Sequence, residues 1–349
     1  MKAESIIEAG KLTGPPDTAY DALLFISFGG PEGMDDVMPF LENVLRGKNV
    51  PHERILMVSK HYERFGGVSP INEANRKIIA ALKPVIELNG PKLPIYWGNR
   101  NWHPLLTDTI KQMTNDGIKR AIAFATAGYS SYSSCRQYIE NIENARVQAG
   151  EAAPQIEKIR PFYNHPRFIS ANAQELLIAL NRIEADRRNQ AKVIFTAHSI
   201  PMTMASVCRY AAQLRQASNL VMASAKIPNS WQVAYQSRSG SLQQPWLEPD
   251  ISNAIEEAAQ EGIKDIVIVP IGFVSDHMEI IYDLDTQAKE LCEKLKIGYQ
   301  RTRTAGSNSE FILMIRDLIQ EKLEQNSLIS FRDTDLNKEY CYQGCCPIG

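Results

Sequence analysis

The sequence predicts an α/β protein built from two similar doubly wound halves. Apolar runs rich in β-branched or aromatic residues alternate with helix-like segments, and this alternation is typical of parallel sheets with crossover helices. Two of the runs end in similar motifs, "LLFISFGGP" and "KVIFTAHSIP", about one domain length apart. A length of 349 residues also exceeds the usual size of a single core.

Six apolar runs are the predicted strands. They show little of the alternation that a half-exposed strand has, so we expect them to be buried on both faces. The six runs are 22–30, 93–99, 121–128, 192–199, 231–237 and 265–273. The helix-like segments that lie between and after them include 74–88, 168–188, 251–263 and 310–325.

The two halves divide near "KIRPFYNHP", at about residue 160. We therefore expect an N-terminal extension over 1–20, a first domain over 21–160, a second domain over 161–325 and a tail over 326–349. The tail is polar, has no clear periodicity, and carries three of the six cysteines within the last nine residues of the chain.

Composition excludes several classes of protein. A formal net charge of −2, with scattered Lys and Arg, offers no basic surface for nucleic acid. The first 20 residues contain no apolar run long enough for the core of a signal peptide, and no later run is long enough for a membrane-spanning helix. We therefore expect a cytoplasmic protein that does not span a membrane. Six cysteines in a chain of this length are too few for a disulfide framework.

Candidate catalytic residues are sought where ligands bind in open parallel sheets, at the carboxyl ends of the strands. His198 stands at such an end and can act as a base or metal ligand near neutral pH, although a lone histidine is commonly structural. Glu279, Asp283 and Gln287 follow another strand at intervals of four, which places them along one face of a helix. That face is either solvated or lines a site that binds a hard cation or moves protons. One imidazole with carboxylates suits a transient divalent-metal site better than a closed structural one.

Two other strand ends carry distinctive sequences. "SFGGPEG" is rich in glycine but matches neither the dinucleotide fingerprint nor the phosphate loop, which argues against a nucleotide. "GYSSYSSCRQY" supplies hydroxyl groups and aromatic rings, which suit a flat and partly polar ligand.

Seven motifs stand in a fixed order between about residues 21 and 325. They are "LLFISFGGPE", "HYERFGGVSPIN", "NWHP", "FATAGYSSYSSCRQY", "TAHSIP", "YQSRSG" followed by "PWLEPD", and "GFVSDHMEIIYD". Together they resemble the ferrochelatase family, whose members insert ferrous iron into a porphyrin in heme biosynthesis. The resemblance implies a lyase with a chelatase-like fold, in which a porphyrin cleft separates two Rossmann-like domains.

The resemblance also implies roles for individual residues. The family's metal-binding and catalytic pair falls on His198 and Glu279, with Fe²⁺ as a substrate. Asp283 continues an acidic file that serves as a path for metal or protons. Gln287 departs from the acidic residue often found there, which places the far end of that path in question.

Four positions match the porphyrin-binding side of the family. Ser69 and Tyr138 correspond to residues that contact the porphyrin, and Tyr62 and Arg46 are weaker matches on the propionate side. A site that bends the macrocycle exposes the lone pairs of its nitrogens, so remote binding energy supports metallation.

The expected porphyrin is coproporphyrin III, which gives coproheme. Family members that use protoporphyrin IX at a membrane carry an extra hydrophobic segment, whereas the interval 33–65 is short and well charged here. Phe28 stands where one branch of the soluble members has a tyrosine that can ligate iron, so direct ligation there is excluded. The alternatives are a protoporphyrin IX ferrochelatase, a cobalt or nickel chelatase, and a tetrapyrrole or metal carrier without catalysis.

The cysteines at the end of the chain have two interpretations. They are thiols on a tail, or ligands of a [2Fe–2S] cluster like the one that some family members carry. The four thiolates of such a cluster would be Cys135, Cys341, Cys345 and Cys346. The adjacency of the last two is awkward for one cluster. Cys208 and Cys292 lie in helix-like segments and are expected to be small buried apolar residues.

Overall fold

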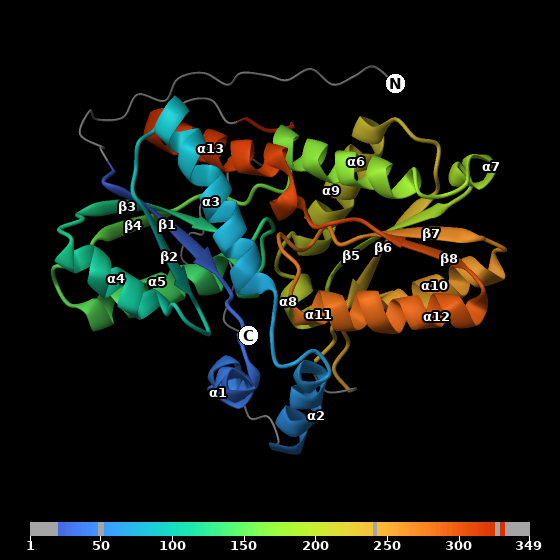
Figure 1. Ribbon diagram of the computed structural model, residues 1–349, viewed down its shortest axis with the longest axis horizontal. Helices are drawn as coiled ribbons and strands as arrows, with labels where there is room; N and C mark the ends of the chain where they lie inside the picture. Colours follow the sequence, from blue (N-terminus) through green and yellow to red (C-terminus); the bar gives the residue numbers. More distant parts are fainter. Residues whose placement is uncertain (1–19, 48–51, 240–242, 325–328, 332–349) are drawn as a thin grey trace.

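Two parallel four-stranded sheets organise the chain (Figure 1). This computed structural model describes residues 20–47, 52–239, 243–324 and 329–331. The sheet orders are β2-β1-β3-β4 and β6-β5-β7-β8, so the second half repeats the topology of the first. The strands are β1 Ala22–Ser27, β2 Ile95–Asn99, β3 Arg120–Ala125, β4 Gln155–Lys158, β5 Lys192–His198, β6 Trp231–Gln236, β7 Asp265–Val269 and β8 Gly298–Arg301. The predicted α/β fold of two doubly wound halves is confirmed.

All six predicted strands are present, and the sequence analysis missed two. β1 and β7 are buried along their whole length, as expected. β2 and β6 are edge strands with partly exposed residues, so the expectation of burial on both faces is wrong for them. The missed strands, β4 and β8, are four-residue edge strands of half-buried and exposed residues, and neither contains an apolar run.

Helices fill the connections between strands. The predicted helix over 168–188 is wrong in extent, because the chain turns after Leu180, where the Arg188 guanidinium donates to the Leu180 carbonyl at 3.0 Å. The α-helices are α1 Met34–Leu45, α2 His52–Glu63, α3 Ile71–Asn89, α4 Leu106–Asn115, α5 Gln137–Ala149, α6 Pro166–Leu180, α7 Ala185–Arg188, α8 Met202–Ala205, α9 Tyr210–Ala225, α10 Ile251–Gln260, α11 Met278–Ile280, α12 Lys289–Leu295 and α13 Ser309–Glu324. Two segments are π-helices, Tyr132–Arg136 and Ile281–Ala288, and Ala305–Ser307 is a 3₁₀ turn.

Each sheet is covered by helices on both faces. In β1, Leu24 and Ile26 pack toward α4 and α5, whereas the alternate residues Leu23 and Phe25 belong to the core under α3 and α13. In the second sheet, α6 and α9 cover one face. The other face carries α10, α12 and the π-helix Ile281–Ala288.

One apolar core joins the two halves. Helix α13 is the last helix of the described chain, yet its Phe311 packs on Phe124 of β3, with ring centroids 6.2 Å apart, and also on Phe168 of α6. Figure 1 shows α13 lying between α3 and α6 above both sheets. A buried bidentate ion pair between Arg160 and Glu321 fastens α13 to the segment that links the halves. Shared packing therefore holds the two sheets in one orientation. The division of the chain into two domains near residue 160 stays a prediction.

Gly272, which follows β7, lies close against β5. A Cβ there would lie 2.4 Å from the Ala197 Cβ and 2.7 Å from its Cα, in β5. Gly272→Ala should therefore lower the free energy of unfolding by about 1–3 kcal/mol through overpacking, measured by urea denaturation. Gly33→Ala is the control, because a methyl there meets no atom within 4 Å and costs at most about 1 kcal/mol as a poorer N-cap. Equal losses in the two variants would contradict the packing argument.

Candidate active site

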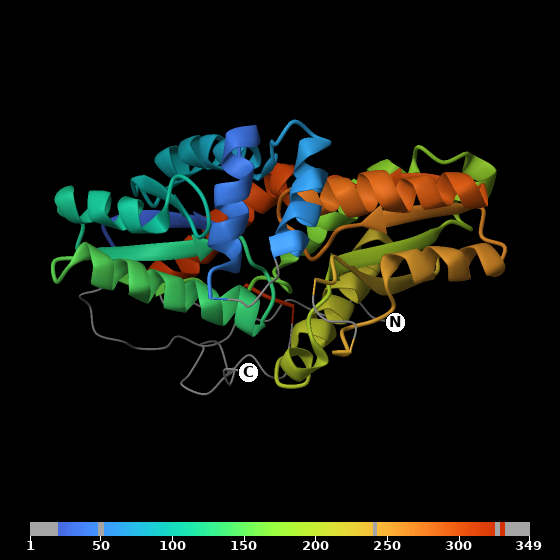
Figure 2. The ribbon, with the colours of Figure 1, turned by 90° about the horizontal axis from the view of Figure 1, so that it is seen from below.

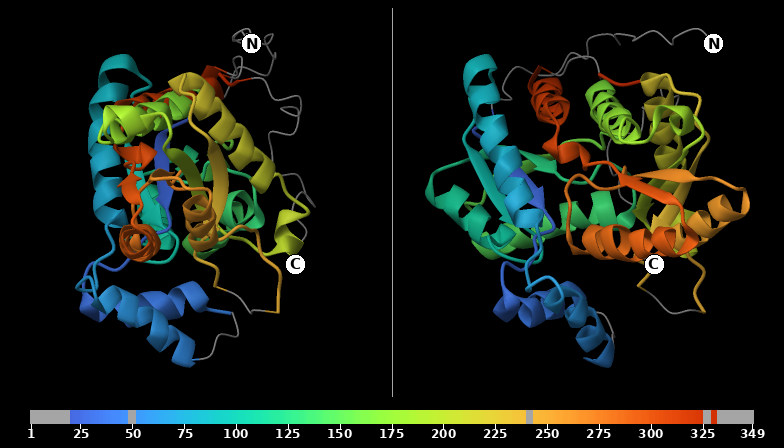
Figure 3. Two further views of the ribbon diagram at one scale, coloured as in Figure 1. Left: turned by 90° about the vertical axis from the view of Figure 1, so that its right-hand side faces the viewer. Right: turned by 45° about the vertical axis from the view of Figure 1, so that its right-hand side comes forward.

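Helices α1 and α2 form an arm that projects from the carboxyl ends of the strands. The arm lies below both sheets in Figure 1 and apart from the rest of the molecule in Figure 3. Seen from below, in Figure 2, it stands between the two halves. Phe40 of α1 and Tyr62 of α2 pack with Met278 of the second half. The arm thus reaches the residue that precedes Glu279.

Helix α2 also contacts the helices that follow Glu279. The His61 ring stacks on the Tyr282 ring at 3.7 Å between centroids. Arg64, just after α2, forms an ion pair with Glu290 of α12 at 3.2 Å. The arm belongs to the first half in sequence, but it is attached to the second half in space.

His198 ends β5 with its imidazole in a fixed orientation. Its Nδ1 lies 2.5 Å from the Ser199 carbonyl oxygen, and because a carbonyl only accepts, Nδ1 carries the proton. The Tyr210 hydroxyl donates to the His198 carbonyl at 3.0 Å and holds the backbone. The second ring nitrogen, Nε2, lies 3.6 Å from Oε1 of Glu279. The structure therefore brings together the two residues that the sequence analysis paired.

The two groups change each other's protonation. Burial alone would lower the pKa of His198, but the charge of Glu279 raises it to about 9. Burial would raise the pKa of Glu279, but the charge of His198 lowers it to about 2. The side chains are 32% and 48% exposed, respectively, so solvent can exchange protons with both. At neutral pH the pair is an imidazolium beside a carboxylate.

Glu279 lies in the short helix α11, which His277 caps. The Nδ1 of His277 accepts the Glu279 backbone N–H at 3.2 Å, which requires an unprotonated nitrogen at that position. Burial lowers the pKa of His277, which favours that neutral form. The sequence analysis assigned His277 no role. Its signal is present in the sequence, because a histidine two residues before the acid is a plausible helix cap.

We expected the file of Glu279, Asp283 and Gln287 to lie on an α-helix. It continues instead on the π-helix Ile281–Ala288. In a π-helix the hydrogen bond runs to the fifth residue, so the turn is wider and four residues make slightly less than one turn. Glu279, Asp283 and Gln287 still follow one another along one side. Gln287 is exposed.

Asp283 has an unusual environment for a carboxyl group. It accepts hydrogen bonds from the Ser237 hydroxyl and from the Gln236 amide, the latter at 3.3 Å. Burial, together with the nearby charge of Glu279, raises the pKa of Asp283 to about 6, against the opposing effect of these bonds. Asp283 therefore changes its charge near physiological pH.

The sequence analysis quoted Gln236 and Ser237 within a motif but gave them no function. They follow β6 directly, so the strand-end rule was sufficient to find them. Ser237 has φ +60°, a left-handed backbone that is uncommon for residues other than glycine. This conformation places its hydroxyl against Asp283.

The four expected porphyrin-binding residues lie in different environments. Ser69 is buried, and its backbone N–H donates to the Pro31 carbonyl at 2.8 Å. Tyr62 is buried beside Met278, and burial with the charge of Glu279 raises the pKa of its hydroxyl, which stays protonated. Tyr138 is buried, whereas Arg46 is exposed at the end of α1.

Arg100 was not predicted, although it directly follows β2. Its guanidinium lies 4.6 Å from the centroid of the Tyr138 ring and 5.7 Å from that of Phe28. Asn141 fixes it through a 2.7 Å hydrogen bond to Nε. Phe28 is 37% exposed after β1, and as a hydrocarbon ring it cannot ligate iron. A cation thus stands between the two aromatic rings at this strand end.

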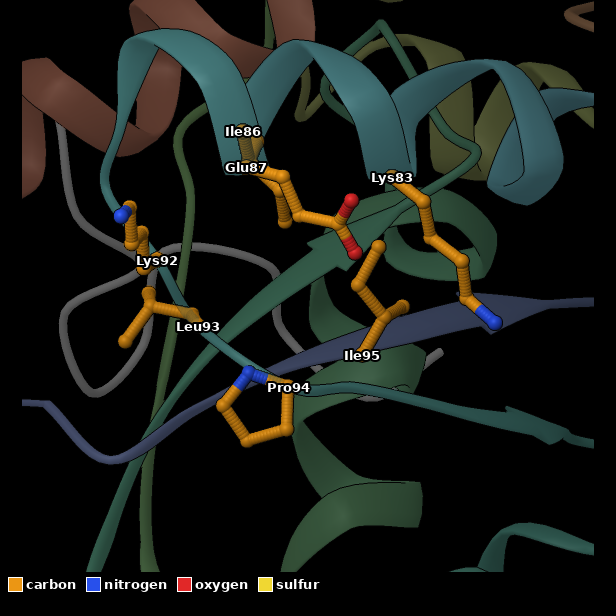
Figure 4. Close-up of a pocket in the computed structure, with 7 residues that line it drawn as sticks. All are labelled: Lys83, Ile86, Glu87, Lys92, Leu93, Pro94 and Ile95. Carbon is orange, nitrogen blue, oxygen red and sulfur yellow. The ribbon is translucent and has the colours of Figure 1, made fainter.

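The described residues contain no group of three or more His, Cys, Asp or Glu side chains close enough to hold a metal ion. A surface pocket of about 350 Å³ lies elsewhere, between α3 and the amino end of β2 (Figure 4). It is lined by Lys83, Glu87 and Ile95, among others. The pocket lies at the amino end of β2, whereas His198 lies at the carboxyl end of β5. Among helices in the described ranges, none has the length and apolar character to cross a membrane.

Of the four candidate cluster ligands, only Cys135 lies in the described part of the chain. It is buried, and its Sγ lies 3.3 Å from the Ser131 carbonyl, to which it donates. Cys341, Cys345 and Cys346 lie outside the described residues. Cys292 is buried as expected, and Cys208 is partly buried.

Comparison with known proteins decides the family. The model of the protein family described as Ferrochelatase matches residues 20–323. The chain belongs to the ferrochelatase family. A ferrochelatase from Rhodopirellula baltica is 53% identical over 329 residues, covering 94% of this chain and 93% of that protein. A coproporphyrin III ferrochelatase from Nocardia farcinica is 44% identical and covers 88% of this chain and 89% of its own.

As a member of this family, the chain is a lyase that inserts ferrous iron into a porphyrin in heme synthesis. Solved structures of chelatases share the fold at low identity. SirB from Bacillus subtilis with Fe³⁺ has a TM-score of 0.55 at 11% identity and covers 88% of this chain and 99% of its own. DR2241 from Deinococcus radiodurans, with structural similarity to chelatases, has a TM-score of 0.55 at 12% identity, over 89% of this chain and 57% of its own. These likenesses show the fold alone.

The protonation of His198 depends on its partner. Glu279→Gln removes the negative charge that raises the pKa of His198, while the burial that lowers it is unchanged. The pKa of His198, measured by NMR titration of labelled histidine, should therefore fall from about 9 toward its ordinary value of about 6.5. Glu293→Gln, on the exposed side of α12, is the matched control and should leave it unchanged. An unaltered titration in Glu279→Gln would show that another group sets the pKa.

Proposed function

We propose that this ferrochelatase metallates coproporphyrin III, and that His198 and Glu279 carry the reaction in the cytoplasm. The observation that carries the proposal is the pair itself, with Nε2 and Oε1 3.6 Å apart at the end of β5. The choice of porphyrin is supported by relatives named coproporphyrin III ferrochelatase at 41–44% identity over most of the chain. The short, charged interval 33–65, which contains the arm, also supports it.

The reaction replaces two pyrrole protons by one Fe²⁺, so two protons must leave as the metal enters. In the resting pair His198 is protonated because Glu279 is ionised. When Fe²⁺ contacts the Glu279 carboxylate, its positive charge offsets the negative charge that stabilises the imidazolium of His198. The pKa of His198 therefore falls. His198 then releases its proton and becomes a neutral base for a pyrrole N–H. The same group takes both protons in turn, passing the first to solvent before it accepts the second.

Asp283 is proposed to bind iron or protons on their path to or from Glu279. With a pKa of about 6 it is ionised in most molecules at pH 7, yet it still exchanges protons readily. Gln287 carries no charge and is exposed, so we propose that the charged path ends at Asp283, with Ser237 and Gln236 as its supports.

The porphyrin-binding assignments are part of the same proposal. Tyr62 supplies a neutral hydroxyl near Glu279, and Ser69 and Tyr138 supply polar and aromatic contacts. Exposed Arg46 suits a propionate that faces water. A cobalt or nickel chelatase and a carrier without catalysis have less support. The relatives at 41–53% identity are ferrochelatases, and a carrier needs no base beside a carboxylate.

Anaerobic metallation with Fe²⁺ tests substrate and mechanism together. The purified protein should turn over coproporphyrin III faster than protoporphyrin IX. His198→Ala should lose about 10²–10⁴-fold in rate, because it removes the general base. Circular dichroism and thermal denaturation would establish that the variant is folded. Faster turnover of protoporphyrin IX would reverse the substrate assignment, and full activity of folded His198→Ala would refute the mechanism.

We also propose that Cys135 and the three tail cysteines hold a [2Fe–2S] cluster. The last described residue, Phe331, pairs with Asn164 through hydrogen bonds of 3.0 and 3.2 Å. The adjoining Tyr163 backbone bonds to Gly128, seven residues before Cys135. The ten residues from Phe331 to Cys341 span about 33 Å when extended. When bound, the cluster would supply one-electron chemistry, and the proposed metallation step does not use it.

The cluster proposal has its own test. Protein purified without residues 341–349, and the full chain with Cys135→Ser, should both lack the visible absorption and the acid-labile sulfide that we expect of the wild-type protein. Cys208→Ser should retain both and serves as the matched control. Equal iron and sulfide content in the wild-type and truncated proteins would remove the proposal.

A further inference from the structure

Arg301 connects the two segments that carry the acidic residues of the site. It ends β8, and its side chain is 15% exposed. The guanidinium bonds to Asp285 in the π-helix at 2.6 and 2.8 Å and to Asp276 in the loop before α11 at 3.1 and 3.2 Å. The remaining N–H donates to the Thr302 carbonyl at 3.0 Å. All five donors of the guanidinium are therefore used. Four of them donate to the carboxylates of Asp276 and Asp285, which precede and follow Glu279 in the sequence.

A second side chain of β8 holds the same helix. Tyr299 lies two residues before Arg301, hence on the same face of the strand. Its hydroxyl donates to the Leu284 carbonyl at 2.8 Å. The strand thus binds two consecutive residues of the π-helix, one through the backbone and one through the side chain.

The π-helix requires such external support. π-helical turns are rare, occur mostly as single turns, and are less favourable than the α-helix they interrupt. Here the π-helix runs for eight residues, Ile281–Ala288. Because so long a π-helix is rare, we expect contacts from outside the helix to hold it in this conformation.

The grip of Arg301 also separates the acids of the site into two classes. Asp276 and Asp285 are neutralised by the same guanidinium. Asp283 is bonded instead to neutral Ser237 and Gln236.

We infer that Arg301 is a positioning residue for metallation: it sets the register of the π-helix that places Asp283 behind Glu279. The inference rests on the proposed roles of Glu279 and Asp283. Arg301 acts through these residues and touches neither substrate.

The test compares Arg301→Gln with Arg301→Lys in steady-state metallation, varying Fe²⁺ and porphyrin separately. Both variants lose the fork that spans two carboxylates, so kcat/KM for Fe²⁺ should fall about 10–100-fold. KM for the porphyrin should change less than twofold. Asp276 and Asp285 are 32% and 36% exposed, so solvent can stabilise both when the arginine is lost. Tyr299→Phe removes only the hydrogen bond from β8 to the Leu284 carbonyl of the π-helix. It provides a milder variant if Arg301→Gln does not fold.

Two controls interpret the outcomes. Arg303→Lys disturbs a bidentate pair with buried Glu175 two residues further on, so it should lower thermal stability without changing iron kinetics. Asp283→Asn should lower kcat/KM for Fe²⁺. If it does so but Arg301→Gln leaves the iron kinetics unchanged, the role of Arg301 is refuted alone. If Asp283→Asn changes nothing, the proposed site and this inference both fall. If Arg303→Lys lowers kcat/KM for Fe²⁺ as much as the Arg301 variants do, Arg301 contributes to general stability and does not position the site.

Discussion

The apolar core that α13 closes is the constraint on which the site depends. Phe311 packs on rings from both halves, and the buried Arg160–Glu321 pair fixes the same helix to the connecting segment. Because this packing holds both sheets in one orientation, the arm that follows β1 can reach Met278 in the other half. A site assembled from two halves needs that rigidity, since displacement of one sheet would separate Tyr62 from Glu279.

Environment then gives chemically similar groups different charges. Glu279 is a carboxylate because an imidazolium faces it, whereas Asp283, one step along the same face, holds its proton until about pH 6. His198 and His277 differ in the same manner: the first is charged beside an acid, and the second is neutral as a helix cap. The acid–base roles thus follow from neighbours and burial, not from residue type.

The sequence predicted what apolar runs and local spacing determine. It located the six apolar strands and the file from Glu279 to Asp283, whereas the resemblance to the family implied the pairing of His198 with Glu279. It missed β4 and β8, whose edge positions require no apolar run, and it assigned an α-helix where a π-helix lies, because a spacing of four fits both. Arg301 was beyond such reasoning, since its partners lie 16 and 25 residues away and are brought to it by the sheet.

The stack of His61 on Tyr282 has a mechanical consequence. Tyr282 immediately precedes Asp283, so the arm and the proposed path of the metal share a point of attachment. An outward displacement of the arm would uncover Tyr282 and remove the outer contact at the start of the π-helix. The arm and the proposed path are therefore mechanically coupled through one pair of rings.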